Sequence, residues 1–138
     1  MKTLSLGDVA VGAALPPLEI PITATLIIGG AIASRDYQDV HHDRDLARER
    51  GAKDIFMNIL TTNGLVGRYV TDWAGPEAIL TGVSIRLGAP NYPGDTMRMT
   101  GSVAEKNGDV VTVEIHGTNG SGEHVSGTVT LKLPGSAR

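Results

Sequence analysis

The spacing of apolar residues changes along the chain, from a helical period before residue 75 to an alternating period after it. Residues 58–73 place four large apolar side chains on one side of a helix: Ile59, Val66, Val70 and Trp73. Asn58 is a suitable N-cap, and Gly75-Pro76 ends the run. We therefore predict one long helix over 58–73 whose apolar side lies in the core.

Two glycines lie inside this helical run. Gly64 and Gly67 each cost about 1 kcal/mol relative to alanine in a helix interior. Their presence predicts that another backbone approaches the helix closely, as it would where a sheet wraps around it.

Beyond the helix, apolar and polar residues alternate, which is typical of half-buried strands. The alternating segments are 79–87, 111–116 and 125–133. Asn107-Gly108 and Asn119-Gly120 lie between such runs, and both residue types tolerate the positive φ of tight hairpin turns. We predict about four antiparallel strands after the long helix, and a short strand near the N-terminus.

This order of elements predicts an α+β protein with a single hot-dog fold, in which an antiparallel sheet wraps around one long central helix. A single sheet has one face to cover, and a helix of this length covers it. The sheet edge and its other face remain available to a partner, and two such units are expected to pair. An ordinary α+β sandwich is the alternative.

Composition narrows the possible functions. The 138 residues are expected to form a single domain, 1–138, with 134–138 as a flexible tail. A net charge of -3 gives no basic surface for nucleic acid, and no apolar run approaches the roughly 20 residues that cross a bilayer. The absence of cysteine excludes disulfides and a thiolate nucleophile, and it is compatible with the cytoplasmic location that we expect.

The candidate chemistry lies in residues 34–43, "SRDYQDVHHD". The apolar run before it, "ATLIIGGAIAS", is expected to form a short buried helix or strand that delivers Asp36 to the surface or to a cleft. Asp36 and His41 lie five positions apart across a loop, which allows both side chains to point at one place. Asp43 is expected to cap a helix over "RDLARER" that ends at Gly51.

Three interpretations of this stretch compete: a metal site, a solvated turn and an acid/base pair. Its carboxylates and imidazoles are plausible metal ligands. However, adjacent histidines in a loop seldom face the same point, so no metal is expected. Asp39 is then expected in solvent, and His42 in solvent or in a structural role. His116 and His124 are expected on the exposed polar faces of strands.

The stretch "RDYQDVHHD" resembles the hydratase motif of MaoC-like enoyl-CoA hydratases, D-x-N-P-x-H-x-D. Asp36, His41 and Asp43 match that motif, whereas Gln38 and Asp39 replace its asparagine and proline. Residues 89–97, "APNYPGDTM", are similar to the family's P-x-x-x-GD-[ST] turn.

Three longer segments extend the resemblance over roughly residues 15–133: "RDYQDVHHDRD", "KDIFMNILTTNGLVGRYVTDWAGP" and "IRLGAPNY". Together they resemble the small MaoC-like subunits of heteromeric enoyl-CoA hydratases of actinobacterial steroid side-chain degradation, including cholesterol catabolism. The resemblance implies that Asp36 and His41 are catalytic. It also implies a larger MaoC-like partner, in a heterodimer or an α2β2 heterotetramer, and a steroid side-chain CoA ester as substrate. No separate cofactor is implied, because the CoA thioester is the substrate.

The chemistry of hydration explains why these residue types are needed. One group must take a proton from water and one must deliver a proton to Cα, and a positioned acid or base contributes about 10²–10⁴-fold. The developing enolate oxygen also needs hydrogen-bond donors. In the family a glycine in an "HGM" stretch supplies a backbone N–H, and Met57-Asn58-Ile59 corresponds to it here. The Asn58 N–H is therefore the candidate oxyanion donor, and Asp43 is expected to support the catalytic loop.

Other functions stay open at this point. The chain could be a homodimeric (R)-specific enoyl-CoA hydratase for shorter acyl chains, or a non-catalytic hot-dog subunit that binds or scaffolds. A hot-dog thioesterase is disfavoured, because residues 58–71 lack the carboxylate that such enzymes carry on the long helix.

Overall fold

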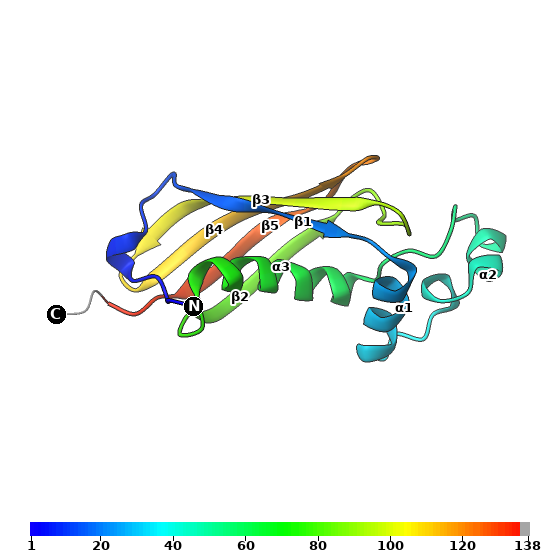
Figure 1. The fold of residues 1–138 in the computed structure, drawn as a ribbon, viewed down its shortest axis with the longest axis horizontal. Helices are drawn as coiled ribbons and strands as arrows, with labels where there is room; N and C mark the ends of the chain where they lie inside the picture. The colour runs from blue at the N-terminus through cyan, green and yellow to red at the C-terminus, as the bar shows by residue number, and fades with distance from the viewer. Residues whose placement is uncertain (136–138) are drawn as a thin grey trace.

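In the computed structural model, which describes residues 1–135, a single antiparallel sheet wraps around one long helix (Figure 1). The sheet has five strands in the order β1-β3-β4-β5-β2. Their bounds are Ala14–Pro21 (β1), Ile79–Leu87 (β2), Thr96–Asn107 (β3), Val110–Asn119 (β4) and Gly122–Lys132 (β5). This confirms the predicted α+β architecture. Residues 136–138 of the expected tail lie outside the described residues, whereas Pro134 accepts a hydrogen bond from the Leu6 N–H.

The long helix α3 (Ile59–Ala74) lies against the sheet, and its ends match the prediction. The Asn58 side chain caps the first turn by accepting from the Thr61 N–H at 3.1 Å, and Gly75 ends the helix at a φ of 95°. Helices α1 (Ala24–Ala33) and α2 (Arg44–Glu49) and the short 3-10 turn η2 (Asp39–His41) gather beyond the start of α3 (Figure 1). A second 3-10 turn, η1 (Leu6–Asp8), precedes β1. None of the helices in residues 1–135 combines the length and the apolar character needed to span a bilayer.

The first turn of α3 is more open than the sequence predicts. Val66 and Val70 are buried, but Ile59 is 49% exposed although it lies on the same side of the helix as Val66. The prediction of a buried Ile59 was therefore wrong, because the side that meets the sheet further along the helix is uncovered at its start. Leu60, the next residue, is exposed as well.

The predicted close approach to Gly64 and Gly67 was also wrong. A Cβ at Gly64 would meet nothing within 4 Å, and a Cβ at Gly67 would meet only a Leu80 methyl at 3.5 Å. The close approach occurs instead between α1 and α3, where a Cβ on Gly30 would overlap the Thr61 side chain. Gly30 thus lets α1 pack against the first turn of α3.

Both hairpin turns fall one residue later than predicted. The loops are Gly108–Asp109 and Gly120–Ser121, and each asparagine forms the last pair of its strand instead. Asn119 still shapes its turn, because its Oδ1 accepts from the Ser121 N–H at 2.8 Å.

The most informative departure from strand alternation is at His124, which was predicted to be exposed and is only 2% exposed. Gly117 pairs with Val125 and Thr118 pairs with Glu123, so His124 is the extra residue of a β-bulge. The bulge breaks the period of two, and both His124 and Val125 are buried. His116, by contrast, is on the half-exposed face as predicted, where its Nδ1 lies 2.8 Å from a Glu123 oxygen.

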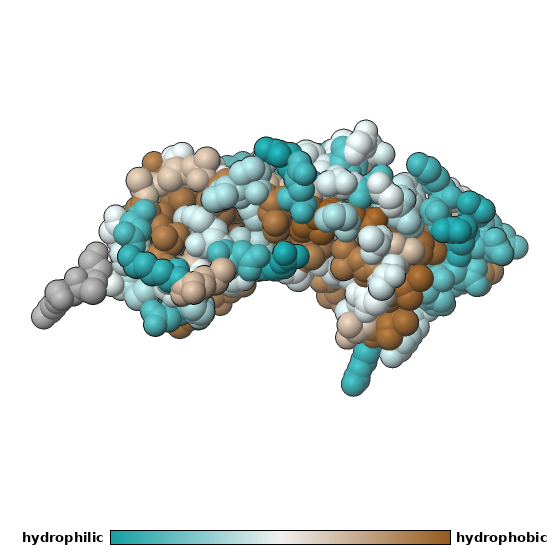
Figure 2. Space-filling view, viewed as in Figure 1, coloured by the Kyte–Doolittle hydropathy of each residue, from teal (hydrophilic) through white to brown (hydrophobic). Residues whose placement is uncertain are grey.

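The two edges of the sheet differ in character. Edge strand β1 contains Pro16-Pro17 at a register shift between Leu15 and Leu18. Edge strand β2 contains no proline and exposes three large apolar side chains: Ile79 at 63%, Val83 at 38% and Leu87 at 37%. Apolar residues also reach the surface over α1, where Figure 2 shows brown atoms. Ile32 of this helix is 53% exposed.

Candidate active site

Asp36 and His41 meet at the end of the molecule where α1, η2 and the start of α3 gather. Helix α1 ends at Ser34, and the Asp36 N–H donates to the carbonyl of Ala31 at 2.9 Å. His41 closes η2, which brings its Nε2 to 3.3 Å from Asp36 Oδ2. The loop therefore aims both side chains at one place, as the spacing suggested.

The hydrogen bonds of His41 determine which ring nitrogen carries a proton. Its Nδ1 lies 2.7 Å from the carbonyl oxygen of Phe56, and a carbonyl can only accept, so Nδ1 holds the hydrogen. In the neutral ring the lone pair of Nε2 then points toward Asp36. The Phe56 ring also packs edge-on against the buried imidazole, with centroids 5.1 Å apart. Two acceptors thus converge, and a water molecule can donate one hydrogen to each.

The side chain of Asn58 joins this pair, which the sequence did not predict. Its Nδ2 donates to Asp36 Oδ2 at 3.1 Å and to Ser34 Oγ at 2.9 Å, while its Oδ1 caps α3. One buried amide therefore links the catalytic carboxylate to the start of the long helix. The sequence held one signal for this role: position 58 is an asparagine, whose side chain can form hydrogen bonds, where the MaoC-like hydratases that it resembles have a glycine. Within residues 1–135, the Asn58 backbone N–H donates to no acceptor.

The surroundings keep Asp36 ionised. Burial is the largest single influence and opposes ionisation, but hydrogen bonds from Asn58 and from the Gln38 N–H outweigh it, with a smaller contribution from the charge that His41 carries when it is protonated. The pKa of Asp36 is lowered as a result. Asp36 is therefore an acceptor at neutral pH.

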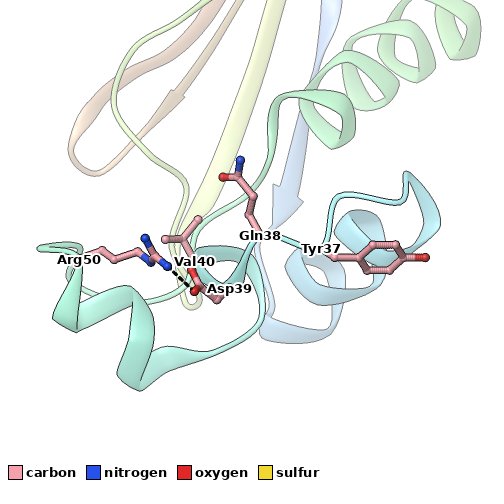
Figure 3. A pocket seen from close by; sticks show the side chains of 5 residues that line it. All are labelled: Tyr37, Gln38, Asp39, Val40 and Arg50. Carbon is pink, nitrogen blue, oxygen red and sulfur yellow. Dashed lines mark hydrogen bonds and ion pairs between the residues drawn. The ribbon is translucent and has the colours of Figure 1, made fainter.

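Asp43 and Asp39 support the loop rather than face the reacting pair. Asp43 caps α2 as predicted, because its Oδ1 accepts from the Leu46 N–H at 3.0 Å. Asp39 was expected in solvent, but it pairs with Arg50 at 2.7 Å. Figure 3 shows this ion pair at a surface pocket of 420 Å³ that Tyr37, Gln38 and Val40 also line. Neither Asp36 nor His41 lines this pocket. No three metal-ligating side chains of residues 1–135 converge on one point.

The backbone just before Asp36 is strained. Among residues 1–135, Arg35 is the only residue other than glycine with a positive φ, at 57°. It follows the C-cap of α1, the place where helices favour glycine in the left-handed conformation. This strained residue directly precedes Asp36, so its backbone conformation determines where the Asp36 side chain points.

Arg35→Gly is expected to raise the free energy of unfolding by about 0.5–1 kcal/mol, because glycine adopts a positive φ without the clash of a Cβ. Arg35→Ala keeps the Cβ and is the matched control, for which no increase is expected. Urea unfolding followed by circular dichroism measures both. Equal stability of the two variants would show that the left-handed backbone carries no penalty here.

The MaoC like domain family matches residues 10–125. The chain is 51% identical over 123 residues to the 3-oxo-4,17-pregnadiene-20-carboxyl-CoA hydratase beta subunit of Mycobacterium tuberculosis, which covers 89% of this chain and 95% of that protein.

Solved structures agree with this match. The ChsH1-ChsH2 complex from Mycobacterium tuberculosis contains a chain that is 51% identical, with a TM-score of 0.88 over 90% of this chain and 98% of that chain. The R-hydratase PhaJ1 from Pseudomonas aeruginosa is 21% identical, with a TM-score of 0.89 over 97% of this chain and 88% of that chain, so it shares the fold.

Proposed function

Because this chain belongs to the MaoC-like domain family, we propose that it is the catalytic subunit of an enoyl-CoA hydratase, which adds water across the α,β double bond of an acyl-CoA thioester. The observation that carries the proposal is the 3.3 Å approach of His41 Nε2 to Asp36 Oδ2, with the other ring nitrogen bound to Phe56. We propose a steroid side-chain CoA ester as the substrate, by analogy with the compound in the relative's name. The reaction needs no separate cofactor, since CoA is part of the substrate.

The proposed reaction moves one proton through this pair. The water oxygen bonds to Cβ of the enoyl thioester while His41 Nε2 accepts one of the water's protons. The imidazolium that forms lies beside the Asp36 carboxylate, whose charge stabilises it. His41 Nε2 then gives a proton to Cα, so that one water is consumed and both residues return to their starting protonation state.

Between these two steps, negative charge lies on the thioester oxygen. The Asn58 N–H at the start of α3 is the proposed donor to it, because it has no acceptor within residues 1–135 and lies at the positive end of the helix dipole. The same residue holds Asp36 through its side chain. Asn58 would therefore align both the base pair and the oxyanion.

A larger MaoC-like subunit is the proposed partner, in a heterodimer or an α2β2 heterotetramer. The 51% identical relative is a beta subunit and is crystallised in a two-protein complex. On this chain, β2 is an open edge with exposed apolar side chains, and the apolar α1 and the first turn of α3 are exposed beside the candidate site. We place the partner sheet along β2, where it would cover these surfaces and complete the substrate site.

Co-expression with the larger subunit tests the proposal. The purified complex is expected to hydrate 3-oxo-4,17-pregnadiene-20-carboxyl-CoA, and this chain alone is expected to have less than about 1% of that rate because its site is incomplete. Hydration is followed by loss of the enoyl thioester absorbance and by product mass. Rapid hydration of crotonyl-CoA by this chain alone would instead support a homodimeric hydratase. A complex that assembles but hydrates neither substrate would support a scaffold subunit.

A further inference from the structure

His124 is a buried imidazole that the proposed reaction does not use. It is the bulged residue of β5, and the bulge turns its side chain into the molecule, toward the first turn of α3. Bulges of this kind re-aim a side chain and often lie near active sites.

Both ring nitrogens of His124 are engaged, and they bind different segments. Nδ1 lies 2.6 Å from the Ala89 carbonyl, so it carries the hydrogen and donates. Nε2 lies 2.9 Å from Thr62 Oγ1 and, in the neutral ring, accepts the hydroxyl hydrogen. Burial is the main influence on this ring and lowers its pKa, although the hydrogen bond to the Ala89 carbonyl and the charge of Asp95 oppose the shift, so the neutral form is favoured. The imidazole therefore joins α3 to the segment after β2.

The segment after β2, residues 89–91, also binds the residue that precedes Asn58. The Asn91 carbonyl accepts from the Met57 N–H at 3.1 Å, and the buried Asn91 side chain accepts from Asn119 Nδ2 at 2.9 Å. Residues before and after Asn58 are thus tied to residues 89–91, Met57 directly and Thr62 through His124. Asn58 itself also contacts Thr62, whose N–H donates to the Asn58 carbonyl at 3.3 Å.

We propose that His124 and Thr62 are positioning residues for hydration, which hold the first turn of α3 so that Asn58 keeps its N–H on the thioester oxygen and its amide on Asp36. This inference rests on the proposed function. An imidazole suits the role because one rigid ring presents a donor and an acceptor on opposite sides, and the bulge supplies its direction. Small misplacements of reacting groups lower rates strongly, by up to about 10²-fold for 1 Å.

Removing the Thr62 hydroxyl in the assembled complex tests the inference. Thr62→Val keeps the side-chain volume and is expected to lower kcat at least about 10-fold, with KM changed less than about twofold. Thr62→Ser restores the hydroxyl and is expected to recover kcat to within about threefold of the original. Thr71→Val is the matched control, because Thr71 lies on the same helix but about three turns from the site. Its hydroxyl donates to the Gly67 carbonyl at 3.0 Å. It is expected to leave kcat unchanged.

His124→Asn probes the other end of the bond. Asparagine can still donate to the Ala89 carbonyl but does not reach Thr62, so kcat is expected to fall as in Thr62→Val. The double variant is expected to lose no more than either single variant, because both remove one interaction. Fully additive losses would overturn the inference, as would a Thr62→Val complex with normal kcat or a Thr62→Ser complex as slow as Thr62→Val.

Hydrogen exchange separates this inference from the proposed function. In Thr62→Val, the amides of Met57 and Thr61 are expected to exchange at least about 10-fold faster than in the original complex or in Thr71→Val. Unchanged exchange would overturn the positioning role. An original complex without hydratase activity would overturn the proposed function instead, and the exchange comparison would still decide whether His124 and Thr62 hold the turn.

Discussion

Asp36→Asn is expected to lower kcat of the assembled hydratase about 10³-fold while the complex stays intact. Asparagine has nearly the same volume as aspartate, and its oxygen at the position of Oδ2 can still accept from Asn58 Nδ2, so the local packing survives. The variant loses the negative charge that stabilises the imidazolium and the second acceptor for the attacking water. Losing one positioned group that stabilises developing charge costs about 10²–10³-fold, which sets the expected size.

Asp39→Asn is the matched control for this prediction. It removes a carboxylate from the same loop, but Asp39 faces Arg50 rather than His41. Its kcat is expected to stay within about threefold of the original. Steady-state kinetics on the purified complexes measures both variants, and native mass spectrometry verifies assembly. An Asp36→Asn complex with full turnover would eliminate the proposed acid/base pair.

The second large effect is expected at the β2 edge. Val83→Lys is expected to weaken binding of the larger subunit at least about 10²-fold, because a lysine at the centre of an apolar strand edge would bring its charge into the interface. Val83 is already 38% exposed in the single chain, so the fold itself is expected to tolerate the change. Activity should fall together with assembly.

Val11→Lys gives the comparison for this substitution. Val11 is 60% exposed and precedes β1, at the opposite edge of the sheet, so the same charge is expected to leave assembly unchanged. Size-exclusion chromatography with light scattering measures the mass of each mixture, and circular dichroism confirms that the variants fold. Normal complex formation by Val83→Lys would move the interface away from β2.

Elements governed by local chemistry could be predicted from the sequence. The long helix has an amide cap at Asn58 and a left-handed glycine at Gly75, and both are short-range signals that no distant residue altered. The same is true of Asp43 at the start of α2. The convergence of Asp36 and His41 follows from a short loop, because five residues limit how far the two side chains can separate.

Features that depend on distant contacts or on one inserted residue could not be predicted. The bulge at His124 adds a single residue to β5, and a period-two pattern does not reveal where such an addition falls. The bond from Asn58 to Asp36 joins residues 22 positions apart, through a side chain that already serves as a helix cap. The exposed Ile59 depends on where the sheet stops, which helical periodicity does not encode.

The prolines in β1 limit how the sheet can grow. A proline has no N–H to donate, and the register shift around Pro16-Pro17 bends the strand, so this edge is a poor template for another strand. Within residues 1–135, only the opposite edge, β2, offers an extended run of unpaired backbone groups. A molecule with one open edge can extend its sheet into one neighbour only, so strand-by-strand growth stops at a pair of sheets and does not continue into a fibre, and any larger assembly must form through other surfaces.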